Sequence, residues 1–331
     1  MFDTMKIVLF QQHKFELWNP PPWVASQLQE RFPQLRFVHP STPEDLLLEL
    51  RDAEVAIGST LPPDELARAS QLKWVHSPAA AVHQFMVPEF VASPAILTNG
   101  RAVFGATVAE HVIALILALA RQLPACERFQ RQRIWGQQLL WNADTRPRTI
   151  AGATLGLVGL GAIGSAVAQR ADALGMNVIA VREHPEKAAE NVTAVYASHE
   201  RSKLLSQSDF VVLAAPVTAA SRHWMDATRL AQMKPTACLI NVGRGALVDE
   251  VALTKALQSK QIAGAALDVF EEEPLAESSP LWTLENLLIT PHCAGFIANL
   301  WERHVEEISA NLGRYLAGYP LVGLVDKTRG Y

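Results

Sequence analysis

Three polar side chains, each placed just beyond an apolar segment, carry groups that could perform one reaction together. Arg244 follows the segment CLINVG, Glu273 lies beyond IAGAALDVF, and His292 follows NLLIT. In open parallel sheets, ligands bind beyond the carboxyl ends of the strands. If these segments are such strands, the three side chains lie at one edge of a sheet.

Reduction of a 2-keto acid by hydride transfer needs these three kinds of group. Arginine offers a fixed fork of donors for the substrate carboxylate. Histidine can donate a proton to the developing alkoxide near neutral pH, and a neighbouring carboxylate orients the imidazole and favours its protonated form. Each residue alone also fits a structural role: Arg244 as a turn cap, Glu273 as a solvated glutamate and His292 as a buried histidine. Their shared position at strand ends favours chemistry.

A glycine-rich segment earlier in the chain has the pattern of a dinucleotide-binding turn. An apolar strand precedes it, a helical stretch follows, and a second apolar strand, 177–181, comes within one βαβ unit. The first glycine permits the tight turn, the second lets the backbone approach a pyrophosphate, and the third lets the helix pack closely. Exposed N–H groups at the start of the helix would hold the phosphates. The predicted cofactor-binding residues here are Gly159, Gly161, Ala162, Ile163 and Gly164.

Arg182 follows the second strand of this unit, where an acidic residue would accept the hydroxyls of the adenosine ribose. An arginine there can pair with a 2′-phosphate, whereas a carboxylate repels it. The sequence therefore favours NADP(H), with NAD(H) possible. Glu183 could take the ribose role if the turn is shifted by one residue. Arg182 could also stack on adenine or lie solvated at the surface.

The composition of the chain limits the classes of protein to which it can belong. The chain has 331 residues, 49% hydrophobic and 19% charged, a formal charge of −4 and a pI near 6.2. This describes an ordinary globular protein and argues against binding to nucleic acid or to an acidic membrane surface. The apolar run 112–120 is too short to span a bilayer. Three cysteines far apart, without CxxC spacing, predict neither a disulfide framework nor a metal site, and they indicate a reduced, cytoplasmic protein.

Two alternations of short apolar segments with helical stretches predict two α/β domains with parallel sheets. The second alternation has continuous apolar strands, as in a doubly wound sheet covered on both faces. Other stretches predict a helix apolar almost all round over 107–121, an extended loop over 133–148 and an amphipathic helix over 302–318. The strands of the first alternation are KIVLF, RFVH, VAIG, KWVHS and ILTN. Those of the second are TLGLVG, NVIAV, FVVLAAP, CLINVG, IAGAALDV and NLLITPH.

The chain resembles the D-isomer-specific 2-hydroxyacid dehydrogenase family over essentially its whole length, in particular members that reduce glyoxylate and hydroxypyruvate. The resemblance lies in AEHVIALILALAR, LGLVGLGAIG, SDFVVLAAPVT, INVGRGALVDE, AALDVFEEEPL and NLLITPHCAG. It implies that Arg244 binds the substrate carboxylate and carbonyl, and that His292, paired with Glu273, is the acid/base. Asp268 would hold the nicotinamide carboxamide, and Pro216 and Val242 would line the cofactor groove.

The resemblance also implies an organisation and an assembly. A substrate domain of residues 1–100 and 296–331, with a flavodoxin-like fold, and a Rossmann nucleotide-binding domain of residues 101–295 would form a cleft. The protein would be a homodimer, in which Trp141 could wall the partner's pocket. The all-round apolar helix independently favours an added subunit contact.

The substrate loop departs from the family pattern. Where the family usually has glycine and a following Asp, the chain reads HSPAAAVHQF, with Ala80 and Ala81 as predicted substrate-binding residues between His76 and His83. Extra methyl groups narrow a pocket, so we predict a small 2-keto acid such as glyoxylate or hydroxypyruvate, with pyruvate slower.

A different class of function remains open: a nucleotide-sensing binding protein, since some transcriptional corepressors resemble this family. A sensor needs the glycine turn but not the catalytic residues, and their retention favours the enzyme. Formate dehydrogenases of the family have Gln at the position of Glu273, which argues against that activity.

Overall fold

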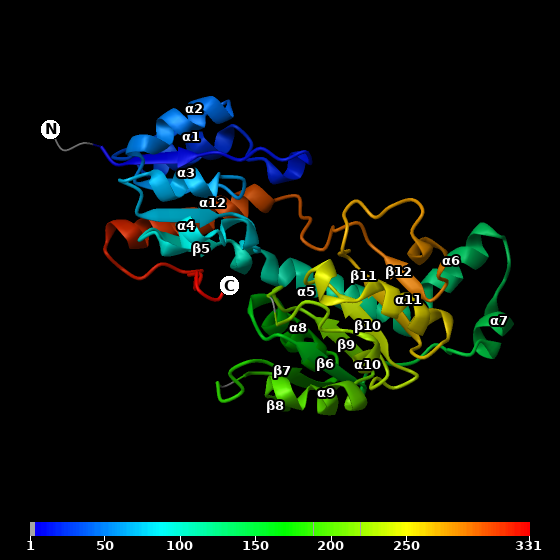
Figure 1. The fold of residues 1–331 in the computed structure, drawn as a ribbon. Helices are drawn as coiled ribbons and strands as arrows, with labels where there is room; N and C mark the ends of the chain where they lie inside the picture. Colours follow the sequence, from blue (N-terminus) through cyan, green and yellow to red (C-terminus); the bar gives the residue numbers. More distant parts are fainter. Residues whose placement is uncertain (1–3, 188, 219) are drawn as a thin grey trace. The chain divides into compact units, whose positions relative to one another are not determined.

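The computed structural model describes residues 4–187, 189–218 and 220–331, and the chain divides into two compact units (Figure 1). Unit 1 consists of residues 1–104 and 297–331, and unit 2 of residues 105–296. Each unit is built around one parallel sheet, so the predicted α/β fold class is confirmed.

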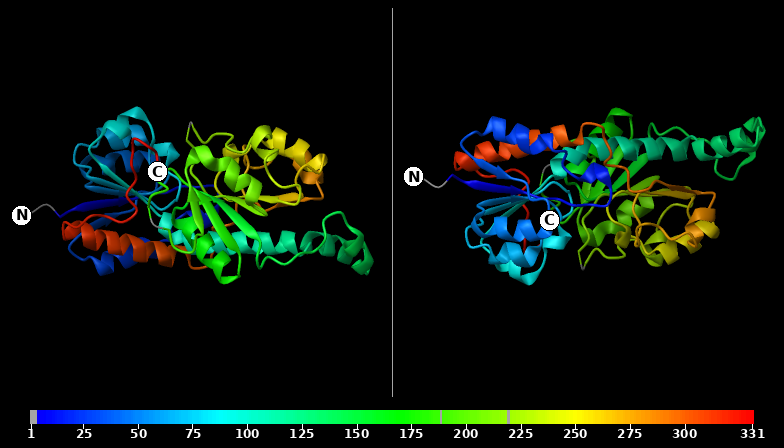
Figure 2. Two further views of the ribbon diagram at one scale, coloured as in Figure 1. Left: turned by 90° about the horizontal axis from the view of Figure 1, so that it is seen from below. Right: turned by 90° about the horizontal axis from the view of Figure 1, so that it is seen from above.

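Unit 1 holds a five-stranded sheet in the order β2-β1-β3-β4-β5. Helices α1 and α12 pack together on one face and α3 and α4 on the other (Figure 2). The strands are β1 (Lys6–Leu9), β2 (Arg36–Val38), β3 (Val55–Ile57), β4 (Trp74–Ser77) and β5 (Ile96–Asn99). The helices are α1 (Trp23–Arg31), α2 (Pro43–Glu49), α3 (Pro63–Arg68), α4 (Pro88–Ala92) and α12 (Leu300–Leu316).

The C-terminal helix α12 completes the core of unit 1. Its apolar stripe, which includes Trp301, Val305 and Ile308, packs in one buried cluster with Leu28 of α1 and Trp74 of β4. The amphipathic pattern read from the sequence explains this placement, because the polar face of the helix stays in solvent.

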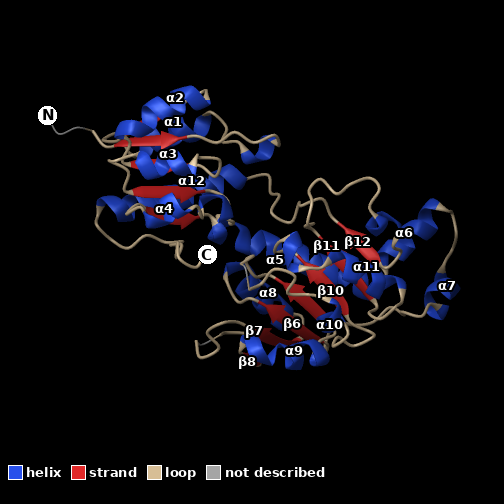
Figure 3. Ribbon diagram, viewed as in Figure 1, coloured by secondary structure: helices blue, strands red, loops and turns tan. Residues whose placement is uncertain are grey.

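Unit 2 holds a seven-stranded sheet in the order β12-β11-β10-β9-β6-β7-β8, whose neighbouring strands are parallel, with helices on both faces (Figure 3). The strand order reverses between β9 and β6, and doubly wound sheets bind ligands at such a reversal. Its strands are β6 (Thr154–Val158), β7 (Asn177–Val181), β8 (Ala194–Tyr196), β9 (Phe210–Leu213), β10 (Cys238–Asn241), β11 (Gly264–Leu267) and β12 (Leu287–Ile289). Its helices are α6 (Leu123–Arg131), α7 (Gln137–Asn142), α8 (Ala162–Ala173), α9 (Arg201–Gln207), α10 (Ala227–Leu230) and α11 (Glu250–Gln258).

Two sequence-based predictions about residues 101–148, most of which belong to unit 2, need correction. Helix α5 (Arg101–Ala120) has 20 residues, so by length and composition it could cross a membrane, although half of its most apolar window is buried, as in core helices. The short length of the apolar run 112–120 therefore did not suffice to exclude a membrane-spanning helix. The predicted extended loop 133–148 contains the short helix α7, flanked by irregular backbone.

Candidate active site

The carboxyl edge of the unit 2 sheet collects the predicted site residues of this unit. Gly159 follows β6, Arg182 follows β7, Arg244 follows β10, Asp268 follows β11, and His292 follows β12. Because all these strands are parallel, residues separated by more than a hundred positions lie along one edge.

His292 and Glu273 form a direct pair at this edge. The Nδ1 atom of His292 lies 2.6 Å from Oε2 of Glu273, and the backbone N–H of Phe270 donates to Oε1 at 3.0 Å. Burial alone would raise the pKa of Glu273. The hydrogen bonds from His292 and Phe270, with the positive charges of His292 and Arg244, hold it below its ordinary value. The carboxylate is therefore ionised at neutral pH, and Nε2 is the imidazole nitrogen left for another partner.

Arg244 lies in the turn after β10, where the protein backbone holds it. The side chain of Asn241 donates to its carbonyl oxygen at 2.9 Å, and its own Nη1 donates to the carbonyl oxygen of Gly243 at 2.6 Å. Burial lowers the pKa of the Arg244 guanidinium, while the charge of Glu273 opposes this shift. An arginine with a lowered pKa still carries its charge at neutral pH, so the site keeps a half-buried cation.

Gly245 brings the turn of Arg244 against the loop of Glu273. A Cβ atom at this position would lie 1.8 Å from the carbonyl carbon of Phe270, so no other residue fits without moving backbone. In the GRG pattern, the glycine after Arg244 is therefore required for packing, and the arginine itself is available for chemistry.

Asp268 organises the segment that carries His292. Its buried carboxylate accepts the hydroxyl of Thr290 at 2.6 Å and the backbone N–H groups of Cys293 and Ala294, both at 3.0 Å. His292 between them has a φ of 50°, in the left-handed region, and its N–H donates to the Asp268 carbonyl at 2.8 Å. Such a conformation costs on the order of 1–3 kcal/mol and persists where its surroundings fix it.

The glycine turn after β6 fits a dinucleotide. Gly159 has a φ of 98°, and a Cβ atom on Gly164 would lie 2.1 Å from the Gly159 carbonyl oxygen. A Cβ atom on Gly161 would meet nothing within 4 Å, and no side chain caps the start of α8. The backbone N–H groups at this helix end are thus available to phosphate oxygens.

The other predicted cofactor residues lie at the same edge. Val242 is buried after β10, and Pro216 is exposed after β9. Arg182 is half-buried just after β7, and its N–H donates to the carbonyl of Tyr196 in β8 at 3.2 Å. Glu183 follows in the exposed turn.

The predicted substrate loop belongs to unit 1. Ala80 and Ala81 are half-buried there, and the side chain of Asn99 fixes the loop by donating to the Ala80 carbonyl at 2.7 Å. His76 precedes the loop in β4. Its imidazole is fully buried with Nδ1 2.9 Å from the hydroxyl of Thr98, and burial, with the charge of His304, lowers its pKa to about 3.

Sequence reasoning missed three residues that support the site. Glu250, at the start of α11, accepts the N–H of Glu271 at 2.7 Å and so holds the loop that carries Glu273. His111 of α5 and Thr290 contact each other at 3.1 Å beside Asp268. The position of Glu250 directly after GRGALVD could have suggested its role, whereas the contact of His111 depends on tertiary packing.

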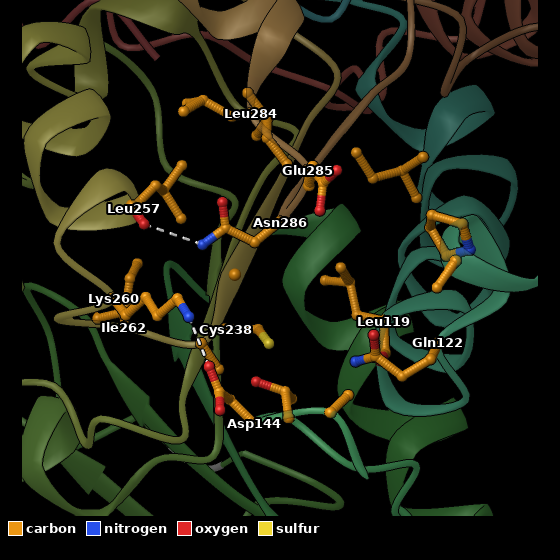
Figure 4. Close-up of a pocket in the computed structure, with 18 of the residues that line it drawn as sticks. Leu119, Gln122, Asp144, Cys238, Leu257, Lys260, Ile262, Leu284, Glu285 and Asn286 are labelled. Atoms are coloured by element: carbon orange, nitrogen blue, oxygen red, sulfur yellow. Dashed lines mark hydrogen bonds and ion pairs between the residues drawn. The ribbon is translucent and has the colours of Figure 1, made fainter. Parts of the chain in front are cut away.

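A cavity of about 640 Å³ lies at the opposite edge of the unit 2 sheet (Figure 4). Its lining includes Cys238 and Asn286, at the amino ends of β10 and β12, and the ion pair of Lys260 with Asp144 at 2.5 Å. The cavity is therefore distinct from the carboxyl-edge site.

Comparison with known proteins identifies the family. Residues 113–294 match the family described as D-isomer specific 2-hydroxyacid dehydrogenase, NAD binding domain. The chain is 35% identical over 279 residues to glyoxylate/hydroxypyruvate reductase B of Shigella boydii, covering 82% of this chain and 85% of the relative. This chain belongs to the D-isomer-specific 2-hydroxyacid dehydrogenase family. It is accordingly an NAD(P)-dependent 2-hydroxyacid dehydrogenase, and unit 2 contains its nicotinamide-binding domain.

Two further members of this dehydrogenase family show the range of its relatives. The D-3-phosphoglycerate dehydrogenase of Methanocaldococcus jannaschii is 34% identical over 255 residues, 76% of this chain, and the match spans about half (47%) of that relative. A solved D-isomer-specific 2-hydroxyacid dehydrogenase from Xanthobacter autotrophicus, in complex with NADPH and MES, superposes with a TM-score of 0.83. It shares 31% identity and covers 99% of this chain and 100% of its own.

The pair of His292 and Glu273 predicts a shift in the pH profile of the dehydrogenase. Because the folded-state pKa of Glu273 is lowered, the pair is present above the ordinary carboxyl pKa and is lost as the pH falls through the lowered one. Glu273→Gln removes the charge that favours a protonated imidazole. It also removes the group whose protonation breaks the pair at low pH, so we expect the variant to have a lower kcat/KM for keto-acid reduction and to lose the acid limb that Glu273 gives the wild type.

The exposed neighbour Glu272 provides the control. Glu272→Gln should leave the profile unchanged. Superimposable profiles for the wild type and Glu273→Gln would show that the carboxylate does not act on the imidazole.

Proposed function

We propose that the protein reduces a small 2-keto acid to the D-2-hydroxy acid, or catalyses the reverse oxidation, with His292 as acid/base and Arg244 as the substrate carboxylate anchor. The observation that carries this proposal is the 2.6 Å contact of His292 Nδ1 with Glu273 at an edge that also presents Arg244. A protein that only sensed a nucleotide would not need this arrangement.

The chain's own residues would bind the substrate and move one proton. The guanidinium of Arg244 would bind the substrate carboxylate through its fork of N–H donors and would polarise the keto oxygen. When bound, the reduced nicotinamide supplies a hydride to the keto carbon. The Nε2–H of His292 would protonate the oxygen as its negative charge develops, while Glu273 stabilises the imidazolium and fixes the ring. Asp268 would orient the nicotinamide carboxamide.

For the cofactor, we propose NADP(H) as the preferred form, with NAD(H) possible. Arg182 supports this preference because it stands after β7, where a carboxylate would exclude a 2′-phosphate. The solved relative from Xanthobacter autotrophicus in complex with NADPH also supports it.

For the substrate, we propose acids of two or three carbons, glyoxylate and hydroxypyruvate first. Relatives named glyoxylate reductase or glyoxylate/hydroxypyruvate reductase B support this choice, as do the methyl groups of Ala80 and Ala81 in the substrate loop. One methylene in a tight pocket is worth only about 1–3 kcal/mol, so the preference should be graded.

The central test is a panel of 2-keto acids assayed with NADPH. Glyoxylate and hydroxypyruvate should give the highest kcat/KM, pyruvate less and phenylpyruvate least. His292→Asn should lower kcat by about 100-fold or more, the scale for losing a general acid. Arg244→Ala should damage KM and kcat together, because its contact serves both ground and transition states.

His223 offers a matched control, since its Nε2 lies 2.8 Å from Glu271 in a similar histidine–glutamate pair. His223→Asn should keep full activity. If His292→Asn also kept it, the acid/base assignment would be wrong. If phenylpyruvate gave the highest kcat/KM, only the small-substrate proposal would fail.

The role of Arg182 predicts a reversal of cofactor preference. Loss of a charge-assisted phosphate contact costs on the order of 1.5–3 kcal/mol, or about 10- to 100-fold in affinity. Arg182→Asp should therefore raise KM for NADPH and bring NADH level with it or ahead. Equal efficiency with the two cofactors in the wild type would argue against the preference, and a loss of NADH activity in Glu183→Gln would assign the ribose contact to Glu183.

We also propose that the enzyme is a homodimer. The segment 123–141 exposes several large apolar side chains, among them Trp135 (90% exposed) and Trp141 (61% exposed). Apolar surface of this kind marks contact sites. Light scattering at micromolar concentration should give twice the mass of the chain. A monomer would refute the proposal, and Trp135→Asp with Leu139→Asp should produce one.

A further inference from the structure

Three metal-binding side chains converge beside the candidate active site. In the part of the chain that the structure describes, one ligand atom each of His111, Asp268 and Cys293 lies within 4.8 Å of the others. They come from α5, from the end of β11 and from the segment after β12. No spacing in the sequence could have indicated this group, and none of the three is among the residues that move a proton or bind the keto acid in the proposed reaction.

The hydrogen bonds around Asp268 define the state of these groups without a metal. The Thr290 hydroxyl donates to Asp268 Oδ1 at 2.6 Å, so its oxygen accepts a hydrogen bond from Nε2–H of His111 at 3.1 Å. Burial and the charge of Asp268 raise the pKa of the Cys293 thiol, so without a metal the thiol keeps its proton. His111 Nε2 itself lies 3.6 Å from Asp268 Oδ1. Asp268 is thus a buried anion beside an imidazole and a thiol, and a cation that binds its Oδ1 would take the place of the Thr290 hydroxyl.

We propose that His111, Asp268 and Cys293 form a binding site for a thiophilic divalent cation, with Zn²⁺ as the best fit. Imidazole nitrogen, carboxylate oxygen and thiolate sulfur are the three ligand types that zinc takes in proteins, and three protein ligands leave a fourth position for water. Softer donors and this mixed set disfavour Mg²⁺ and Ca²⁺, which prefer oxygen ligands.

The binding step balances simply. Zn²⁺ displaces the thiol proton of Cys293, which leaves to solvent, and His111 stays neutral by carrying its proton on Nδ1 instead of Nε2. The two anionic ligands then neutralise the cation. Zinc bond lengths place its ligands about 3.3–3.8 Å apart, so the side chains must close by about 1 Å. His111 and Cys293 are both partly exposed, which leaves the cation a path from solvent.

Occupancy of this site should oppose cofactor binding. This consequence, unlike metal binding itself, rests on the proposed function, in which Asp268 holds the nicotinamide carboxamide. A carboxylate engaged by a metal cannot serve that amide equally well, so Zn²⁺ and NADPH should weaken each other's binding by the same factor.

The test measures metal binding directly on chelator-treated protein. Calorimetric titration with Zn²⁺ should give one site per chain, and Co²⁺ in its place should give the near-ultraviolet absorption of a thiolate–cobalt bond. Cys293→Ser should abolish that absorption and weaken Zn²⁺ binding at least about tenfold, the least that metal sites lose when a supporting group is removed. Cys126→Ser, which removes another partly exposed thiol, should change neither.

Two results would overturn the site: no Zn²⁺ binding by the wild type at micromolar concentrations, or equal binding by Cys293→Ser and Cys126→Ser. A Zn²⁺ affinity that falls in the presence of NADPH would support both the metal site and the position of the nicotinamide. Zinc bound with the cobalt signature but without effect on NADPH would support the metal site while arguing against the role of Asp268 in the proposed function.

Discussion

The buried carboxylate of Asp268 is the interaction on which the arrangement of this site depends. It accepts the Thr290 hydroxyl and the N–H groups of Cys293 and Ala294, and its backbone carbonyl accepts the N–H of His292. These contacts fix a turn in which His292 adopts a left-handed conformation that a free chain would rarely populate. With the turn fixed, the imidazole meets Glu273. Loss of the Asp268 carboxylate would remove the side-chain hydrogen bonds that hold this turn and so would disrupt the pair of His292 and Glu273.

Hydrogen bonds to the backbone also hold the loop after β11 that carries Glu273. The N–H of Phe270 donates to Glu273, and Glu250 accepts the N–H of Glu271, so the loop after β11 is held at both its start and its middle. Gly245 lets the turn of Arg244 touch this loop. The cation, the carboxylate and the imidazole are therefore positioned by backbone contacts within one unit. Such positioning lets charged groups act without reorganising during the reaction.

The sequence predicted most of this because parallel strands leave strong local signals. Continuous apolar segments marked every strand of both sheets except β8, a half-buried edge strand whose run, AVY, is only three residues long. Helix α7 was missed because its six residues, all outside the core, show no periodic apolar face. The predicted helix 107–121 missed residues 101–106 of α5, in which Gly105, a poor helix former, interrupts the helical pattern.

The sequence indicated that the predicted site residues would lie at one edge of the sheet, but it did not indicate which residues contact and support them. Arg244, Glu273 and His292 follow strands, and topology alone brings the ends of parallel strands together. The contact of His111 with Thr290, by contrast, depends on how a distant helix packs on the sheet, and nothing local in either segment indicates it. The burial of His76 likewise depends on tertiary packing, because the elements packed on a sheet decide which strand side chains they cover.

The central claim, that this edge directs hydride transfer to a 2-keto acid, is tested most directly by isotope transfer. NADPH deuterated at the transferred C4 position would be incubated with the protein and hydroxypyruvate, whose reduction product, glycerate, is chiral at C2. The product would then be analysed by mass spectrometry and chiral chromatography. The account predicts a D-2-hydroxy acid with deuterium on C2. A product of the L configuration, a product without deuterium, or tight NADPH binding without any product would contradict it.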